Sequence, residues 1–267
     1  MVSLERITAE QKRTLIAAAL GWMLDAFDTM LYALVLTHIM RDLGMSKGTA
    51  GLLNTLTLLA SGIGGVLFGY LADRVGRKRA LMLSILTYSI CSFASGLSHT
   101  ILQLAAFRFL LGLGMGGEWN TGATLVAETW PTELRAKALA IVQSSFAIGY
   151  ALAAVVAGIV LRYADWRVVF FVGLVPAAMV LWIRRRVPES AMWQEHHRLG
   201  EEAKQGATAR HAHEAGSSAQ LFRPPLAGKT SALLLANLFG MFAWWDCSPG
   251  SRLTCPFRLS RVVAASA

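Results

Sequence analysis

Cysteine and charge are both scarce in this sequence, and each shortage excludes a class of protein. The three cysteines, Cys91, Cys247 and Cys255, show neither a disulfide framework nor the paired spacing of a metal site. Charged residues make up 15% of the chain, against about a quarter in soluble domains. With 55% hydrophobic residues and a mean hydropathy of +0.48, the chain is predicted to be an all-α membrane protein.

Catalytic patterns are missing as well. The sequence shows no nucleophile–base pair and no phosphate-binding loop, because the glycine-rich run 112–117 lies inside an apolar stretch rather than after a strand. His196, His197, His211 and His213 lie in a polar stretch without the fixed spacing of metal ligands. We therefore expect neither an enzyme nor a metal site, and we interpret the polar stretch as a solvated linker.

Long apolar segments dominate instead. A helix of about 20 apolar residues crosses the hydrocarbon core of a bilayer. Candidate spans cover about 14–40, 51–72, 80–97, 101–128, 138–161 and 168–183, with a shorter seventh at 231–245. Small residues four apart allow close helix packing, which we expect at Gly62, Gly65 and Gly69 in the second span and at Gly112 and Gly116 in the fourth.

The net charge of +9 is concentrated in alternate loops. Lys and Arg gather in 1–13, 73–79, 131–137 and 184–230, whereas the intervening loops hold only Arg41, Lys47, Arg162 and Arg167. Cytoplasmic loops of membrane proteins carry the excess of cations, so we expect the N-terminus in the cytoplasm. The basic charge then requires no nucleic-acid partner.

Ionisable residues deep in a span are costly and usually functional, and four lie there: Asp25, Asp28, Arg108 and Glu118. Asp25 and Asp28 share one helix face, where repulsion and desolvation disfavour two ionised carboxyls, as proton exchange requires. Arg108 is a candidate partner for these carboxyls or for an anionic substrate. Asn120, beside Glu118, is a candidate pathway-lining residue. The alternative is a structural ion pair between the first and fourth spans.

Residues 69–78 between the second and third spans read GYLADRVGRK. This loop resembles the G-x-x-x-D-R-x-G-R-K motif of the major facilitator superfamily. Residues 108–114 are similar to the R-x-x-x-G-x-G segment of that family's fourth helix, Glu128 and Arg135 have its E-x6-R spacing, and Val187-Pro188-Glu189-Ser190 looks like its PES segment. Residues 21–28 resemble the D-x-F-D segment of proton-coupled carriers for aromatic acids, sialic acid and related carboxylates.

The resemblance implies the N-terminal six-transmembrane-helix bundle of a major facilitator transporter plus a truncated seventh helix. It implies symport of a small organic acid by alternating access in the lipid of a bacterial-type inner membrane, with H⁺ as coupling ion and no other cofactor. Asp25, Asp28 and Arg108 would couple the proton to the substrate. The gate would be formed by Gly69, Asp73, Arg74, Gly76, Arg77 and Lys78. A sugar:H⁺ symporter and a non-transporting membrane remnant are the alternatives.

The chain is predicted to consist of a bundle over 1–186, a cytoplasmic linker over 187–230, the start of a seventh helix over 231–245 and a tail over 246–267. The composition changes abruptly at Asp246, and Pro249 and Gly250 break the helix pattern. We expect a frameshift near codon 246, with 246–267 as out-of-frame translation; a native divergent tail is the alternative. Transport would then need the missing C-terminal half or a second copy.

Overall fold

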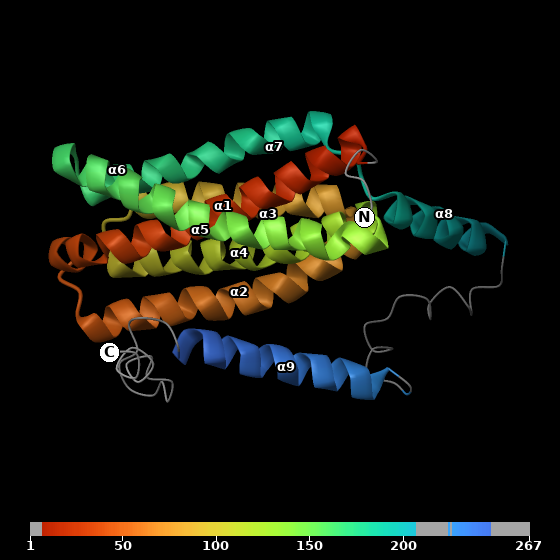
Figure 1. The fold of residues 1–267 in the computed structure, drawn as a ribbon. Coiled ribbons are helices and arrows are strands. Elements are labelled where there is room, and N and C mark those ends of the chain that lie inside the picture. The colour runs from red at the N-terminus through yellow and green to blue at the C-terminus, as the bar shows by residue number, and fades with distance from the viewer. Residues whose placement is uncertain (1–6, 207–223, 225, 247–267) are drawn as a thin grey trace, which may run out of the picture. The chain divides into compact units, whose positions relative to one another are not determined.

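The computed structural model describes residues 7–206, 224 and 226–246, and every regular element in this part of the chain is helical (Figure 1). The predicted tail beyond Asp246 lies outside the described residues, as do 207–223 of the predicted linker. The helices are α1 (Ala9–Asp42), α2 (Lys47–Val75), α3 (Arg77–Gly96), α4 (Ile101–Thr129), α5 (Thr132–Tyr163), α6 (Trp166–Phe171), η2 (Val172–Leu174), α7 (Val175–Arg186), α8 (Ala191–Gly206) and α9 (Ala227–Asp246).

Each expected span is helical, but the spans differ in apolarity. By length and composition, α1, α2, α5 and the stretch Trp166–Arg186 are apolar enough to cross a membrane. The helices α3 and α4 fall below this measure, because α3 begins with Arg77, Lys78 and Arg79, and α4 carries Arg108 and Glu118. Both lie within the same bundle as the four apolar stretches.

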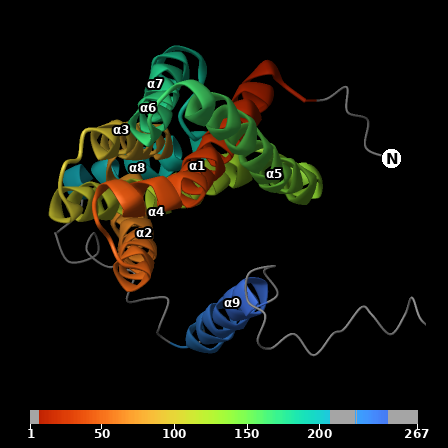
Figure 2. The same ribbon diagram turned by 90° about the vertical axis from the view of Figure 1, so that its left-hand side faces the viewer.

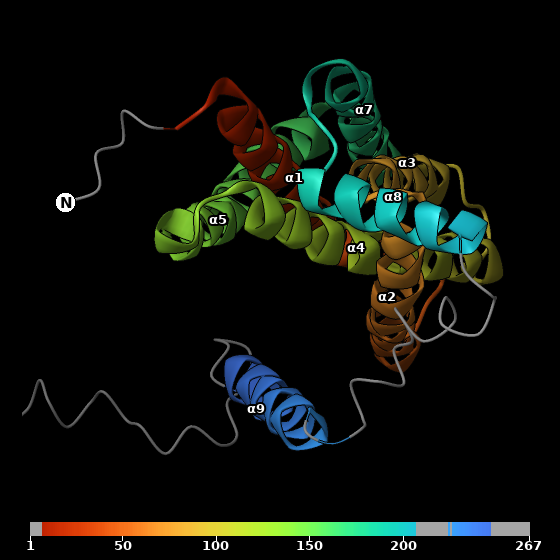
Figure 3. The same cartoon turned by 90° about the vertical axis from the view of Figure 1, so that its right-hand side faces the viewer.

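Helices α1 and α4 form the centre of the bundle, as the views along its axis show (Figures 2 and 3). They contact each other, while α5 packs against α1, and α2 and α3 pack against α4. Helix α3 also packs against α6 and α7. The outward faces are apolar too, as Val66 of α2 and Ile159 of α5 illustrate, which suits a bundle surrounded by lipid.

Close approach of α2 and α4 depends on glycine. A Cβ at Gly116 would overlap the carbonyl oxygen of Ser61, and one at Gly64 would lie 2.7 Å from the Cα of Leu113. The expected contacts at Gly112 and Gly116 are therefore present. In α2, however, Gly62 and Gly69 have no neighbour within 4 Å of a Cβ position, because the face that meets α4 contains Gly64 instead.

The two ends of the bundle differ in charge. At one end, the side-chain amide of Gln11 donates to the carbonyl of Thr129, and Lys78 Nζ donates to the carbonyl of Arg184. These bonds bring the basic segments 1–13, 73–79, 131–137 and 184–190 to the same end. At the other end, Arg167 forms an ion pair with Asp42 at 2.8 Å.

The chain divides into two units, residues 1–198 and 199–267. The first holds α1 to α7 and the first half of α8, and the second holds the rest of α8 and α9. Helix α9 covers the segment expected to begin a seventh span. Helix α8 was not expected; the Ser190 hydroxyl accepts a hydrogen bond from the Trp193 N–H at its start, which is a typical N-cap.

Candidate functional site

The four ionisable residues singled out from the sequence lie on α1 and α4, inside the bundle. Asp25, Asp28, Arg108 and Glu118 are all at most 5% exposed. The structure divides them into two groups. Asp28 lies beside Arg108, whereas Asp25 lies near Glu118.

Arg108 is held by a carboxylate and two aromatic rings. Its Nη1 atom lies 3.7 Å from Asp28 Oδ2, and its guanidinium carbon lies 3.9 Å from the Tyr32 ring centroid and 5.0 Å from that of Phe170. These are cation–π distances. Within the described residues, Arg108 Nε and Nη2 have no hydrogen-bond partner. The guanidinium therefore keeps donors for a second anion.

Asp28 is also tied to α3, because the Ser92 hydroxyl donates a hydrogen bond to Asp28 Oδ1. A Cβ at Gly173 of η2 would lie 3.3 Å from that oxygen and would overlap the Ser92 hydroxyl. The absence of a side chain at Gly173 thus leaves room for this contact. Ser92 and Gly173 were not predicted from the sequence.

Asp25 and Glu118 form a second group that has no cation of its own. The two carboxyls are close enough to repel each other, and Asp25 also feels the charge of Asp28. Asp25 Oδ1 and Glu118 Oε2 have no hydrogen-bond partner within the described residues. Two buried carboxylates without partners would be costly, so the arrangement favours a proton on at least one of them.

Gly21 creates the space for this second group, because a Cβ there would overlap Glu118 Oε1. Tyr88 of α3 completes it. This side chain is fully buried, its hydroxyl has no partner among the described residues, and it interacts electrostatically with Glu118, Asp25 and Asp28. A polar residue at every fourth position of α3, namely Ser84, Tyr88 and Ser92, is the sequence signal that was overlooked.

Aromatic rings from three helices lie side by side near the second group. Trp22 of α1 lies 4.6 Å from Trp119 of α4 and 5.0 Å from Phe146 of α5, measured between ring centroids. Tyr150 lies 5.0 Å from Phe146 and interacts electrostatically with Asp25. All four rings are half-buried. They offer an aromatic surface next to the buried carboxyls.

Asn120 is not part of the buried groups. Its side chain is exposed, and its amide donates to the carbonyl of Gly116 in the same helix at 3.1 Å.

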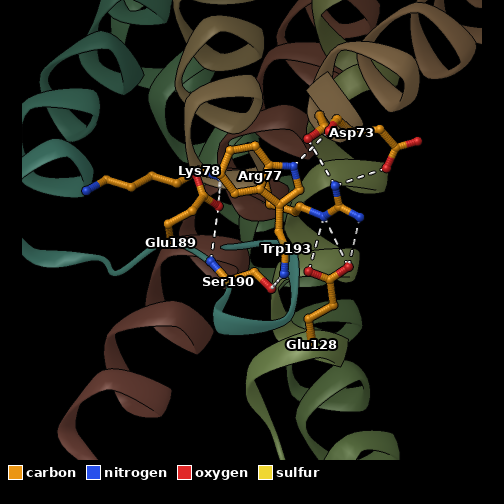
Figure 4. Close-up of polar contacts among 8 residues, drawn as sticks. Asp73, Arg77, Lys78, Glu128, Glu189, Ser190 and Trp193 are labelled. Atoms are coloured by element: carbon orange, nitrogen blue, oxygen red, sulfur yellow. Dashed lines mark hydrogen bonds and ion pairs between the residues drawn. The ribbon is translucent and has the colours of Figure 1, made fainter. Parts of the chain in front are cut away.

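The 69–78 segment forms a network centred on Arg77 (Figure 4). Arg77 Nε donates to both Glu128 carboxylate oxygens at 3.1 Å, its Nη2 lies 3.0 Å from Glu128, and its Nη1 lies 3.0 Å from Asp73. Nη1 also donates to the carbonyl of Ala72. Because Arg77 begins α3, Asp73 ends α2 and Glu128 ends α4, this guanidinium ties three helix ends together.

Glu189 caps α3 from a distant part of the chain. Its Oε1 accepts hydrogen bonds from the N–H groups of Lys78 and Ser190, at 3.0 and 3.1 Å. A carboxylate is favourable at a helix N-terminus. Gly76 precedes the helix with φ +107°, and a Cβ there would overlap Glu189 Oε2, so this position requires glycine.

The remaining motif residues are less connected. Arg135 does not meet Glu128; its Nε donates instead to the carbonyl of Trp130 at 3.4 Å. Arg74 lies over the Tyr70 ring at 4.4 Å, and Gly69 borders open space. The sequence analysis missed Trp193, whose indole N–H donates to the carbonyl of Asp73 at 2.8 Å (Figure 4).

On α8, hydrogen bonds from Arg198 hold the pKa of the exposed Glu195 carboxyl below its usual value. This pair lies on the surface and does not enter the Arg77 network.

The sequence is similar to known transporters. The profile of the Major Facilitator Superfamily matches residues 18–246. The chain is 41% identical over 189 residues to a probable 4-methylmuconolactone transporter of Cupriavidus pinatubonensis, covering 69% of this chain and 44% of that protein. It is 39% identical over 191 residues to the sialic acid transporter NanX of Escherichia coli, covering 72% and 47%.

The fold is similar to that of solved transporters. The xylose transporter XylE from E. coli, in a partially occluded inward-open conformation, superposes with a TM-score of 0.67 at 22% identity, covering 74% of this chain and 53% of that one. The chain thus spans about half the length of the curated relatives it matches.

Proposed function

Because this chain belongs to the Major Facilitator Superfamily, whose members here are transporters rather than enzymes, we propose that it takes part in proton-coupled transport of a small organic acid. The relatives support this substrate class, since their names specify a muconolactone and sialic acid. The apolar helices indicate a multi-pass membrane protein. We place its N-terminus on the cytoplasmic side of an inner membrane, because the basic segments share one end of the bundle.

Arg108 carries the proposal. It is a fully buried cation with two unpartnered donors and a single, long ion pair to Asp28. A planar guanidinium with free donors can bind a carboxylate through two hydrogen bonds. When Asp28 takes up a proton, its attraction to Arg108 falls, and Arg108 becomes available to the carboxylate of the substrate.

Asp25 and Glu118 provide the second proton site. Either carboxyl can hold the proton, and the buried Tyr88 hydroxyl lies close to both. The half-buried rings of Trp22, Trp119, Phe146 and Tyr150 offer a stacking surface for the apolar part of the substrate. Substrate and proton would thus meet between α1 and α4.

Alternating access requires two bundles that rock about a shared site. The described bundle supplies one of them, and we propose that a C-terminal half or a second copy of this chain supplies the other. The Arg77 network would gate the basic end, because it joins the ends of α2, α3 and α4 and can be broken as they move.

Ligand binding to the purified full chain in detergent tests the proposal. We expect 4-methylmuconolactone or sialic acid to change the tryptophan fluorescence, and we expect net proton uptake from a weakly buffered solution on binding. D-xylose should do neither. A response to D-xylose alone would support the sugar symporter instead, and no response to any of the three would favour a non-transporting protein.

A further inference from the structure

A cavity at the basic end of the bundle belongs to neither of the sites above. It has a volume of about 470 Å³ and lies between α3, α7 and the start of α8. Its lining includes three cations, Lys78 and Arg79 of α3 and Arg184 of α7, together with Met82 and Trp193. Lys78, Glu189 and Trp193 are visible from this side in Figure 4.

The charges of the cavity are not balanced. Its one carboxylate, Glu189, is already bound to the N–H groups of Lys78 and Ser190 at the N-terminus of α3. Arg79 and Arg184 are exposed and make no ion pair or side-chain hydrogen bond within the described residues. The cavity therefore presents two free guanidinium groups, with the Lys78 ammonium nearby, and these suit an anion with several acceptor oxygens.

The surface next to the cavity is apolar. Leu83 of α3 is 46% exposed and lies one helical turn beyond Arg79. Leu181 of α7 is 60% exposed and lies nearly one turn before Arg184, in the same direction along the bundle. The cations thus lie at the rim of the lipid-facing surface, where the headgroup of a phospholipid would be found when its acyl chains cover Leu83 and Leu181.

We propose that this cavity binds the phosphate headgroup of an anionic glycerophospholipid, with Arg79 and Arg184 as the phosphate ligands and Leu83 and Leu181 in contact with the acyl chains. A bound lipid would connect α3, α7 and α8 directly beside the Arg77 network.

Native mass spectrometry of the full chain in detergent tests the site. Phosphatidylglycerol should bind with higher affinity than phosphatidylcholine. The double variant Arg79→Ala/Arg184→Ala should bind phosphatidylglycerol on the order of 10-fold to 30-fold more weakly, given about 1 kcal/mol per cation near an anionic surface. The matched control Arg185→Ala/Arg186→Ala removes two neighbouring cations that do not line the cavity, and it should bind as the parent does.

Further arms distinguish the alternatives. Met82→Trp fills the cavity without changing its charge and should also weaken binding. Glycerol phosphate at millimolar concentration should not displace the lipid; displacement would assign the site to a soluble phosphate and overturn the proposal. Equal loss in the Arg185/Arg186 control, equal binding of both lipids, or full binding by Met82→Trp would also overturn it.

Discussion

At the scale of single residues, this protein combines buried charges with glycines that make room for them. Asp28 and Arg108 attract each other, whereas Asp25 and Glu118 repel each other. Gly21 and Gly173 allow the carboxyl groups to approach neighbouring helices. A larger side chain at either glycine would push Glu118 or Ser92 out of place.

Arg108→Lys should weaken binding of the organic acid by about 10-fold to 100-fold, because a lysine cannot form two parallel hydrogen bonds to a carboxylate or stack on Tyr32. Tryptophan fluorescence titration of the purified chain measures this. Arg167→Lys, at the far end of the bundle, is the matched control and should bind normally. Parent-like affinity in Arg108→Lys would contradict the role of Arg108.

Gly76→Ala should destabilise the protein by about 1–3 kcal/mol, because its φ of +107° is unfavourable for alanine and its Cβ would overlap Glu189. Thermal unfolding in detergent, followed by circular dichroism, measures the change. Gly69→Ala lies in the same motif but faces open space, and it should be neutral or slightly stabilising. Equal unfolding temperatures for the two variants would refute this account of Gly76.

At the scale of helices, contacts between distant segments hold the bundle together at its basic end. Arg77 joins the ends of α2, α3 and α4, and Glu189 caps α3 from the connection between α7 and α8. Trp193 adds a hydrogen bond from α8 to the end of α2. Loss of one contact should therefore loosen a helix end rather than unfold the bundle.

Glu189→Gln should increase hydrogen exchange at the first turn of α3, because a neutral amide is a weaker acceptor than a carboxylate; the expected loss is about 1 kcal/mol. Hydrogen–deuterium exchange of residues 76–80 reports it. Glu195→Gln changes an exposed carboxylate on α8 and should leave that region unchanged. The cap would be refuted if both variants exchange as the parent does.

Gly116→Ala should disturb the packing of α2 against α4, since the added methyl group overlaps the carbonyl of Ser61. Overpacking of this kind costs about 1–3 kcal/mol, which the unfolding temperature in detergent would show. Gly62→Ala, on a face of α2 with open space, is the control and should not lower it. A stable Gly116→Ala variant would mean that the helices can separate without cost.

At the scale of the whole molecule, the bundle has a basic end and an opposite end that carries the Arg167–Asp42 ion pair. This asymmetry supports the proposed orientation in the membrane. A cysteine introduced by His99→Cys should react with an impermeant maleimide added outside intact cells, whereas one introduced by Glu133→Cys should react only after the membrane is opened. The reverse pattern would invert the proposed topology.

The sequence alone determined the helical membrane fold and the family, because apolar length, loop charge and the 69–78 motif are local features. It also identified Asp25, Asp28, Arg108 and Glu118, since a charge within an apolar run is visible without a structure. It did not determine which of them are partners.

Only the tertiary structure decided those pairings. Arg77 rather than Arg135 meets Glu128, Gly64 rather than Gly62 faces α4, and Tyr88 joins the carboxyl groups from α3. The physical reason is that the rotation of each helix about its axis depends on how all its neighbours pack, and residue spacing within one helix carries no information about the side chains that another helix presents.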